Sequence, residues 1–333
     1  MLIMLALAVQ ATPAPGPVKV FGDWAVACDN TRLCEATSLP IPAKDTDVEV
    51  TSMLMSIVRG AGSDGELRIQ AESEGTAPVA LQIDGREVAA ANSSGPEVIF
   101  TGAAAEQAVR AMTNGASATL VTGGRTLGKV SLAGVAATLR FIDAQQGRAG
   151  TVTALVARGN RPSSAVPTPP AAPRIGQVRW SGTAATLTPA LARSLVQISK
   201  CDAEIDPANQ PIKTLAIGEG KTLVLIPCGA GAYNFSSVPL IIASGRAALA
   251  RFDSPPGFTK AGDAIATLVN AGWDGKTGEL SSYSKGRGIG DCGSAERYVF
   301  DGTRFRMVEA RQMSDCRGST NWLRTWVATP TVR

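Results

Sequence analysis

The sequence predicts a β-rich α+β protein with two domains stapled by disulfides: a β-sandwich-like N-terminal domain and an α+β C-terminal domain built on an antiparallel sheet. Three observations lead to this expectation. The chain has 333 residues, whereas a single core seldom grows beyond about 250–300 residues. Its 35 glycines and 20 prolines favour turns and short strands over long helices. Its six cysteines lie in close pairs, as in a protein that folds outside the cytoplasm.

Residues 1–17 are interpreted as a signal peptide and leader. Residues 1–9 are apolar, and Val9 and Ala11 place small residues at positions −3 and −1 of a cleavage site. The run is too short to span a bilayer, and the usual positively charged start is missing. We therefore predict a periplasmic or secreted protein with no membrane span in the mature chain. A short buried N-terminal segment is the alternative.

The cysteines are predicted to form three disulfides between neighbours in the sequence. These pairs are Cys28–Cys34, Cys201–Cys228 and Cys292–Cys316. Other connectivities are possible, but a Pro-rich stretch separates the first pair from the other four cysteines. The alternative is a metal site. The sequence has neither a CxxC motif nor a histidine, so no metal is expected.

The Pro-rich stretch, residues 161–174, is predicted to be a linker. Five prolines fall within residues 161–173, and such a segment favours an extended polyproline conformation. It would divide a first domain, residues 18–160, from a second, residues 175–333. A long surface loop inside one domain is the alternative.

In the first half, alternating apolar residues and turn signals predict strands followed by two helices. The strands are expected over residues 21–28, 50–59, 66–72, 79–83 and 87–91. Asp84-Gly85 predicts a hairpin turn. The helices are expected over residues 103–112 and 131–146, the second with Ser131 as its N-cap.

In the second half, Thr188 followed by proline predicts the start of a helix over residues 190–198. Strands are then expected over residues 215–217, 222–227, 238–243 and 247–252. The last hairpin is predicted to turn on Asp301-Gly302 as a two-residue loop. Its apolar face would carry Tyr298, Phe300, Phe305 and Met307, and its solvent face Arg297, Arg304 and Arg306.

Residues 21–34, 285–293 and 316–322 together resemble the DUF1176 family of bacterial periplasmic proteins of unknown function. The resemblance covers essentially the whole mature chain. The first domain also resembles, more loosely, the invasion-associated locus B proteins, which are secreted or periplasmic β-sandwich proteins of Gram-negative bacteria linked to entry into host cells. These resemblances imply a location in the cell envelope and bring no catalytic residues.

The composition excludes several classes of function. The chain has no histidine, which removes Ser-His-Asp and Cys-His catalysis and His-ligated zinc. Its 32 basic and 28 acidic residues are interspersed, so no nucleic-acid partner is expected. Residues 288–293 match GxGxxG, but a predicted strand follows where a dinucleotide site needs a helix. No cofactor is therefore expected.

Three sets of polar residues are candidate sites, each weighed against an ordinary structural role. The first surrounds the glycine-rich loop, where converging charges suit an anionic ligand; its members are Lys285, Arg287, Asp291 and, through the Cys292–Cys316 bridge, Arg317. A second ligand-binding candidate is Tyr233 with Asn234. A candidate partner contact lies at the stapled tip and comprises Asp29, Asn30 and Arg32.

The leading functional hypothesis is a non-enzymatic binding or interaction protein of the periplasm or envelope, with an unknown envelope or protein partner. One alternative is a carboxylate-dependent hydrolase of envelope polysaccharide or peptide. Its available carboxylates are Asp253, Asp263, Asp274 and Asp291, and no spacing singles out a pair. The other alternative is a secreted inhibitor or virulence factor that acts on a host protein. No catalytic residues are assigned.

Overall fold

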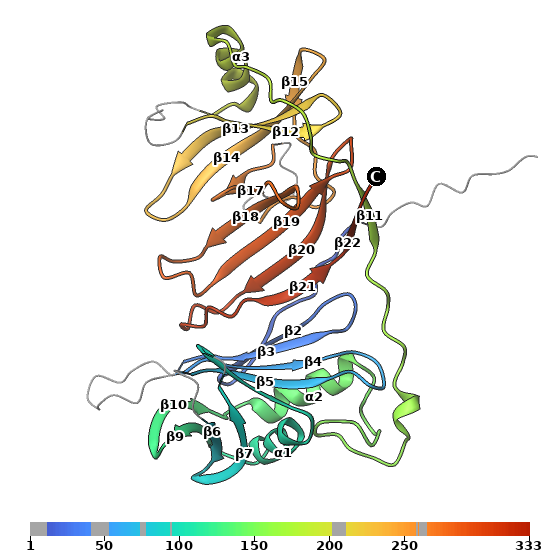
Figure 1. The fold of residues 1–333 in the computed structure, drawn as a ribbon, viewed down its shortest axis with the longest axis vertical. Coiled ribbons are helices and arrows are strands. Elements are labelled where there is room, and N and C mark those ends of the chain that lie inside the picture. Colours follow the sequence, from blue (N-terminus) through green and yellow to red (C-terminus); the bar gives the residue numbers. More distant parts are fainter. Residues whose placement is uncertain are drawn as a thin grey trace, which may run out of the picture.

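The computed structural model describes residues 12–40, 53–73, 78–93, 95–201, 211–257, 259 and 265–333. Antiparallel sheets lie in layers, with the sheets of the second half above those of the first half in Figure 1. The predicted β-rich α+β class is therefore confirmed. The part of the expected signal peptide before residue 12 lies outside the described residues.

The first sheet has six strands in the order β1-β2-β3-β4-β5-β8. Its strands are β1 (Lys19–Phe21), β2 (Trp24–Cys28), β3 (Cys34–Ser38), β4 (Met55–Arg59), β5 (Leu67–Glu72) and β8 (Glu97–Thr101). Side chains alternate between its faces, as in any strand. In β4, Met55 and Ile57 are buried, while Ser56 and Val58 are only half-buried. One face therefore packs on a core, and the other keeps polar side chains.

The single strand expected over residues 21–28 is two strands, because Phe21 pairs with Trp24 and the chain reverses between them. Gly22 has a φ of 57°, and a Cβ atom there would lie 2.6 Å from the carbonyl oxygen of Ala133. The turn needs glycine, since both the left-handed backbone and the close approach exclude a side chain. The apolar alternation on either side concealed this turn.

A four-stranded sheet and two helices cover the core face of the first sheet. This sheet has the order β10-β9-β6-β7. Its strands are β6 (Pro78–Ile83), β7 (Arg86–Asn92), β9 (Ser117–Thr122) and β10 (Arg125–Ser131). The helices are α1 (Gly102–Met112) and α2 (Val135–Gln145). Strands β8, β9 and β10 were not predicted from the sequence.

The prediction that Ser131 caps the second helix is wrong, because Ser131 is the last residue of β10. The residue before α2 is Gly134, which has a φ of 90° and no capping side chain. A Cβ atom at Gly134 would collide with the carbonyl oxygen of Phe21. The helix therefore starts where the backbone passes closely under the β1–β2 turn.

The second half contributes two five-stranded sheets. The upper sheet orders its strands β12-β13-β14-β15, with β16 also paired to β14. These strands are β12 (Lys213–Gly218), β13 (Lys221–Ala230), β14 (Phe235–Ala243), β15 (Arg246–Leu249) and β16 (Leu268–Val269). Helix α3 (Pro189–Ser199) packs on this sheet. The predicted N-cap is confirmed, since the Thr188 hydroxyl accepts a hydrogen bond from the Leu191 amide at 3.2 Å.

The lower sheet has the order β17-β18-β19-β20-β21. Its strands are β17 (Gly272–Asp274), β18 (Glu279–Lys285), β19 (Gly293–Phe300), β20 (Phe305–Met313) and β21 (Leu323–Val327). The last predicted hairpin joins β19 to β20. Its four apolar side chains, Tyr298, Phe300, Phe305 and Met307, all lie in the core between the two sheets.

Two details of that hairpin were predicted wrongly. Phe300 pairs with Phe305, so the loop has four residues rather than two. Arg306 is buried instead of facing solvent: its guanidinium lies 2.7 Å from a carboxylate oxygen of Asp253 and 3.3 Å from one of Asp301. These two carboxylates supply the partners that make the burial of a cation tolerable.

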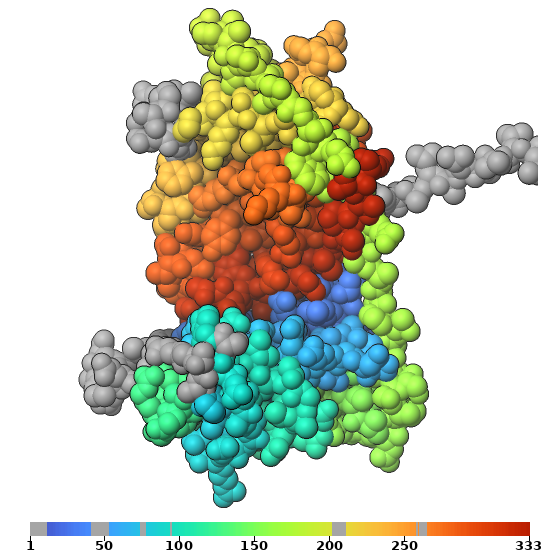
Figure 2. All heavy atoms as spheres, in the orientation of Figure 1, coloured from blue at the N-terminus to red at the C-terminus, as the bar shows by residue number. Residues whose placement is uncertain are grey.

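The two halves of the chain contact one another along β2 and β21 (Figure 1). Ala25 and Ala27 of β2 face Met313, Trp322 and Leu323 in a small apolar cluster. Figure 2 shows the halves packed together in space-filling view, with the Pro-rich stretch along one side. That stretch holds the short 3-10 helix Ser163–Ala165 and leads into β11 (Arg174–Gln177), which pairs in parallel with β22 (Thr329–Val332). The division into two domains at residues 161–174 stays a prediction.

Three disulfides close the structure. They join Cys28 to Cys34, Cys201 to Cys228 and Cys292 to Cys316, the neighbouring pairs expected from the sequence. No helix among the described residues is both long and apolar enough to cross a membrane.

Candidate functional site

In the glycine-rich loop between β18 and β19, Arg287 and Asp291 neutralise each other. The Arg287 guanidinium donates two hydrogen bonds to the Asp291 carboxylate, one of them 2.8 Å from Nε to Oδ1. The amide of Gly318 donates a third at 2.6 Å. The Arg287 hydrogen bond, with help from that amide, lowers the pKa of Asp291, whose side chain is fully enclosed. This pair therefore fixes the loop, and another cation of the predicted set, Lys285, has its ammonium 5.8 Å from the centroid of the Tyr283 ring.

Arg317 does not join this cluster. Its guanidinium bonds to a carboxylate oxygen of Asp23 at 2.6 Å and to the carbonyl oxygen of Gly22 at 3.0 Å. It thus ties the loop after the third disulfide to the β1–β2 turn of the first sheet. Here Arg317 is an internal contact between the halves of the chain.

The structure brings the second candidate pair, Tyr233 and Asn234, to the glycine-rich loop. The Asn234 amide donates to the Lys285 carbonyl at 2.8 Å and accepts from the Lys285 amide at 3.1 Å. The Tyr233 hydroxyl donates to the Gly286 carbonyl at 3.2 Å. Asn270, which the sequence did not single out, donates to the carbonyls of Tyr233 and Tyr283. The two predicted sites are one connected set of loops.

The stapled tip is engaged with β21 of the second half. Asp29 is buried and lies 2.8 Å from the Arg324 guanidinium. Asn30 makes two hydrogen bonds to the Val327 backbone, at 2.9 and 2.7 Å. Arg32 adopts a φ of 63°, and its carbonyl accepts from Gln146. Asp29 and Asn30 thus hold the two halves together, whereas Arg32 bonds within the first half, and an external partner at this tip stays a prediction.

The carboxylates considered for hydrolysis have structural roles where they are described. Asp253 is ion-paired to Arg306, and Asp291 is paired to Arg287. Asp274 accepts bonds from Lys276 and Thr277 within its own turn. Asp263 lies outside the described residues.

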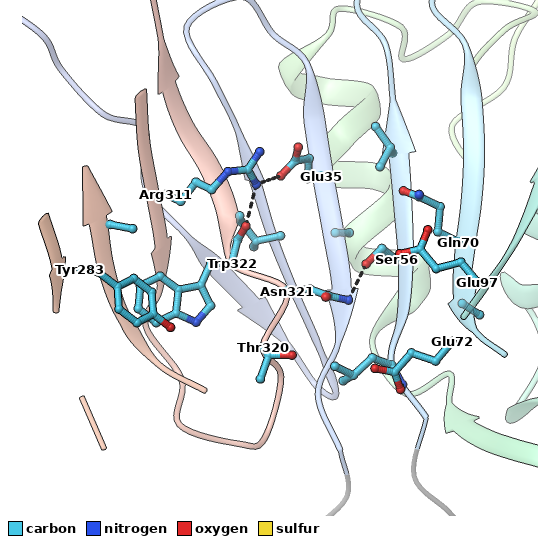
Figure 3. Close-up of a pocket in the computed structure, with 16 residues that line it drawn as sticks. Glu35, Ser56, Gln70, Glu72, Glu97, Tyr283, Arg311, Thr320, Asn321 and Trp322 are labelled. Atoms are coloured by element: carbon cyan, nitrogen blue, oxygen red, sulfur yellow. Dashed lines mark hydrogen bonds and ion pairs between the residues drawn. The ribbon is translucent and has the colours of Figure 1, made fainter. Parts of the chain in front are cut away.

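A groove of about 480 Å³ opens where the outer face of the first sheet meets the loop before β21. Figure 3 shows its side chains converging from the two halves of the chain. Its lining comprises Glu35, Ala36, Leu54, Ser56, Val58, Gln70, Ala71, Glu72, Glu97, Tyr283, Ala295, Arg311, Thr320, Asn321, Trp322 and Leu323. Such a volume suits a small ligand or one or two rings of a larger one.

One wall of the groove is aromatic and rigid. The rings of Tyr283 and Trp322 stack with centroids 4.6 Å apart at an angle of 20°. The Trp322 indole donates to the Gly290 carbonyl at 3.1 Å, which attaches this wall to the glycine-rich loop. Burial raises the pKa of the Tyr283 hydroxyl, so it stays a neutral hydrogen-bonding group.

The opposite wall carries hydroxyl, amide and carboxylate groups on the outer face of β3, β4, β5 and β8. The Asn321 amide spans the two walls, with a 3.0 Å bond to the Ser56 hydroxyl. Glu35 is paired with Arg311 at 3.2 Å and also accepts from the Arg324 amide. Glu72 and Glu97 lie directly opposite each other on neighbouring strands. Neither has an ion-pair partner within the described part of the chain.

Sequence reasoning missed this groove entirely. A local signal existed, since polar residues alternate with apolar ones along β4 and β5. That alternation marks an outward face but does not reveal that residues 320–323 lie over it. No group of three or more potential metal ligands occurs within the described ranges.

Together, the fold and the groove define a class: a disulfide-bonded, strand-rich α+β protein with an open polar groove between two sheets. A family model described as "Protein of unknown function (DUF1176)" matches residues 18–329, so the chain belongs to that family and the resemblance predicted from the sequence is confirmed. The chain is 30% identical to the uncharacterized protein YpfG of Escherichia coli K12, over 96% of this chain and 94% of that protein.

The structure is also similar, weakly, to the crystal structure of invasion associated protein B from Bartonella henselae. The TM-score is 0.30 and the sequence identity 17%, over 39% of this chain and 99% of that one.

Proposed function

We propose that this protein is a non-enzymatic binding protein of the bacterial envelope and that its ligand occupies the groove between the first sheet and the loop before β21. The observation that carries the proposal is the lining itself. A stacked aromatic pair faces hydroxyl, amide and carboxylate side chains across about 480 Å³. Ligand sites combine such an apolar surface with a few polar groups that fix orientation.

The groove is also held in shape before any ligand arrives. Asn321 is bonded to Ser56 and Trp322 to Gly290, while Arg311 joins Glu35 to the Trp322 carbonyl at 2.9 Å. A preformed site loses less conformational entropy on binding. Ordered loops on either side therefore support binding.

The proposed location is the periplasm. Three disulfides fit a protein that matures in an oxidising compartment. In a Gram-negative bacterium that compartment gives access to polysaccharide and peptide fragments of the envelope, which are the ligands we propose to test.

The test is a thermal-shift screen of the oxidised full chain against envelope fragments, because a ligand that binds only the folded state raises Tm. Gln70→Trp would place a bulky ring in the groove, whereas Arg68→Trp alters the same face of β5 outside the lining. We expect a fragment that stabilises the native chain and Arg68→Trp but leaves Gln70→Trp unchanged. Equal stabilisation of all three chains would place the ligand elsewhere and refute the proposal.

A further inference from the structure

We infer that the groove recognises a primary amine carried on a hydroxylated ring, which is the chemistry of an amino sugar. This inference rests on the proposed function, since it names the class of ligand for the same groove.

The charge of the groove is opposite to that of the chain. The protein carries a formal net charge of +4, yet the lining contains three carboxylates, Glu35, Glu72 and Glu97, against one cation, Arg311. Glu35 is neutralised by Arg311. Glu72 and Glu97 have no ion-pair partner among the described residues, so the described lining carries two negative charges beyond the Glu35–Arg311 pair, and a concave site focuses such a field on its ligand.

Glu72 and Glu97 repel each other across neighbouring strands of the first sheet. They are direct partners across antiparallel strands, where Cβ atoms lie about 4.5–5.5 Å apart and like charges destabilise the sheet. Among the described residues, the Glu72 carboxylate accepts one hydrogen bond, from the Leu54 amide at 3.3 Å. An ammonium group seated between the two carboxylates would donate a hydrogen bond to each of them, and its positive charge would relieve their repulsion.

The remaining lining favours a hydroxylated ring over an extended peptide. Strands β3, β4 and β5 are paired on both sides, so their backbone groups are not free to bind a peptide as an added strand. The side chains in the lining can instead exchange hydrogen bonds with the hydroxyl groups of a ligand. They are Ser56, Gln70, Thr320 and Asn321. The Tyr283–Trp322 pair adds an aromatic wall suited to the apolar face of a ring.

The experiment is calorimetric titration of the oxidised full chain at about pH 6, where an amine is protonated. The probes are a β-1,4-linked glucosamine oligomer, its N-acetylated counterpart of equal length, and a lysine-containing peptide. We expect the glucosamine oligomer to bind at least about tenfold more tightly than the N-acetylated one, and added salt to weaken it. The lysine peptide should bind more weakly than the glucosamine oligomer.

The variant Glu72→Gln/Glu97→Gln should abolish the preference for the amine. The matched control, Glu87→Gln, removes an exposed carboxylate from β7 in the other sheet of the first half and should change nothing. If both oligomers bind the native chain with equal affinity and neither binds Gln70→Trp, the inference of an amine ligand is overturned and the proposed function stands. Absence of binding by both oligomers, or tighter binding of the peptide, would overturn the inference, while the fragment screen decides the proposed function separately.

Discussion

The glycine-rich loop and the groove lie side by side and use charged residues in opposite ways. In the loop, Arg287 and Asp291 are four residues apart and satisfy each other. In the groove, Glu72 and Glu97 come from different strands and face each other with like charge. Trp322 touches both regions through its bond to Gly290.

This difference separates charges that maintain the fold from charges that are available to a ligand. Removing a partner from a buried, hydrogen-bonded pair leaves unpaired polar groups and lowers stability. Removing one of two opposed like charges relieves repulsion and raises stability. Functional residues often carry such a cost in stability. Substitutions in the two regions should therefore change the free energy of unfolding in opposite directions.

The largest effect is expected from Asp291→Ala in the loop. The change leaves the Arg287 guanidinium and the Gly318 amide without their acceptor, and we expect a loss of about 2 kcal/mol in the free energy of unfolding. Urea denaturation of the oxidised protein measures it. Asp315→Ala, a half-exposed carboxylate in the neighbouring loop, is the control. Equal stability of Asp291→Ala and native protein would show that the pair does not hold the loop.

The same pair has a pH dependence of known sign. The hydrogen bond from Arg287 lowers the pKa of Asp291 in the folded state, so the unfolded chain takes up this proton first as the pH falls. The stabilisation is complete above the unfolded pKa of about 3.9 and is lost as the pH falls through the folded value. The difference in unfolding free energy between the native chain and Asp291→Ala, measured by urea denaturation, should therefore become smaller as the pH falls below about 4.

A smaller effect of opposite pH sign is expected from Glu296→Gln on the inner face of the same sheet. Burial raises the pKa of Glu296 against hydrogen bonds from Ser294 and Gly257, and its Oε2 atom has no hydrogen-bond partner within the described ranges. A raised folded pKa means that stability is lost as the pH rises from about 4.3, the unfolded value, through the folded value.

The Gln variant should thus show a flatter dependence of unfolding free energy on pH between about 4.5 and 8. Glu87→Gln, an exposed carboxylate, should reproduce the native profile. If the unfolding free energies of the native chain and Glu296→Gln depend on pH in the same way, the prediction that burial raises the pKa of Glu296 is wrong.

A gain in stability is expected from Glu97→Lys in the groove. Lysine opposite Glu72 replaces a like-charged pair by an oppositely charged one, which stabilises neighbouring strands by roughly a few tenths of a kcal/mol. The same change should abolish binding of a cationic ligand. Chemical denaturation and ligand titration of the same preparation measure its stability and its binding. A loss of stability with unchanged binding would show that Glu97 maintains the fold and is not available to a ligand.

The smallest effect is expected from Asn321→Ala. Its bond to Ser56 is exposed, so the free energy of unfolding should change by no more than about 0.5 kcal/mol. Ligand affinity should fall clearly, because Asn321 spans the groove. Thermal denaturation with and without ligand measures both, and a large loss of stability would instead assign Asn321 a role in joining the halves.

Much of the local structure was predictable because local sequence determines it. The Asp84-Gly85 turn, the Thr188 cap of α3 and the apolar face of the last hairpin follow from neighbouring residues alone. Errors occurred where distant groups decide the backbone. The residue before α2 is a glycine because the Phe21 carbonyl approaches Gly134 too closely for a side chain. Arg306 is buried because Asp253 and Asp301 are its ion-pair partners.

The candidate sites divide in the same way. Lys285, Arg287 and Asp291 were found because they are close in sequence, and the structure adds Tyr233 and Asn234 to their loop. The sequence could not reveal that Arg317 bonds to Asp23 or that Asp29 bonds to Arg324, since nearly three hundred residues separate these partners.

By itself, the sequence determined the β-rich class, the neighbouring cysteine pairs and the family, because strand alternation, turn chemistry and motifs are written in short segments. Only the tertiary structure decided the groove. Its residues come from both halves of the chain, namely from β3, β4 and the residue before it, β5, β8, β18, β19, β20, β21 and the loop before β21. They meet because strand register and the packing of β2 against β21 place them there. Register follows from which face of each strand is buried, and that is a property of the whole fold.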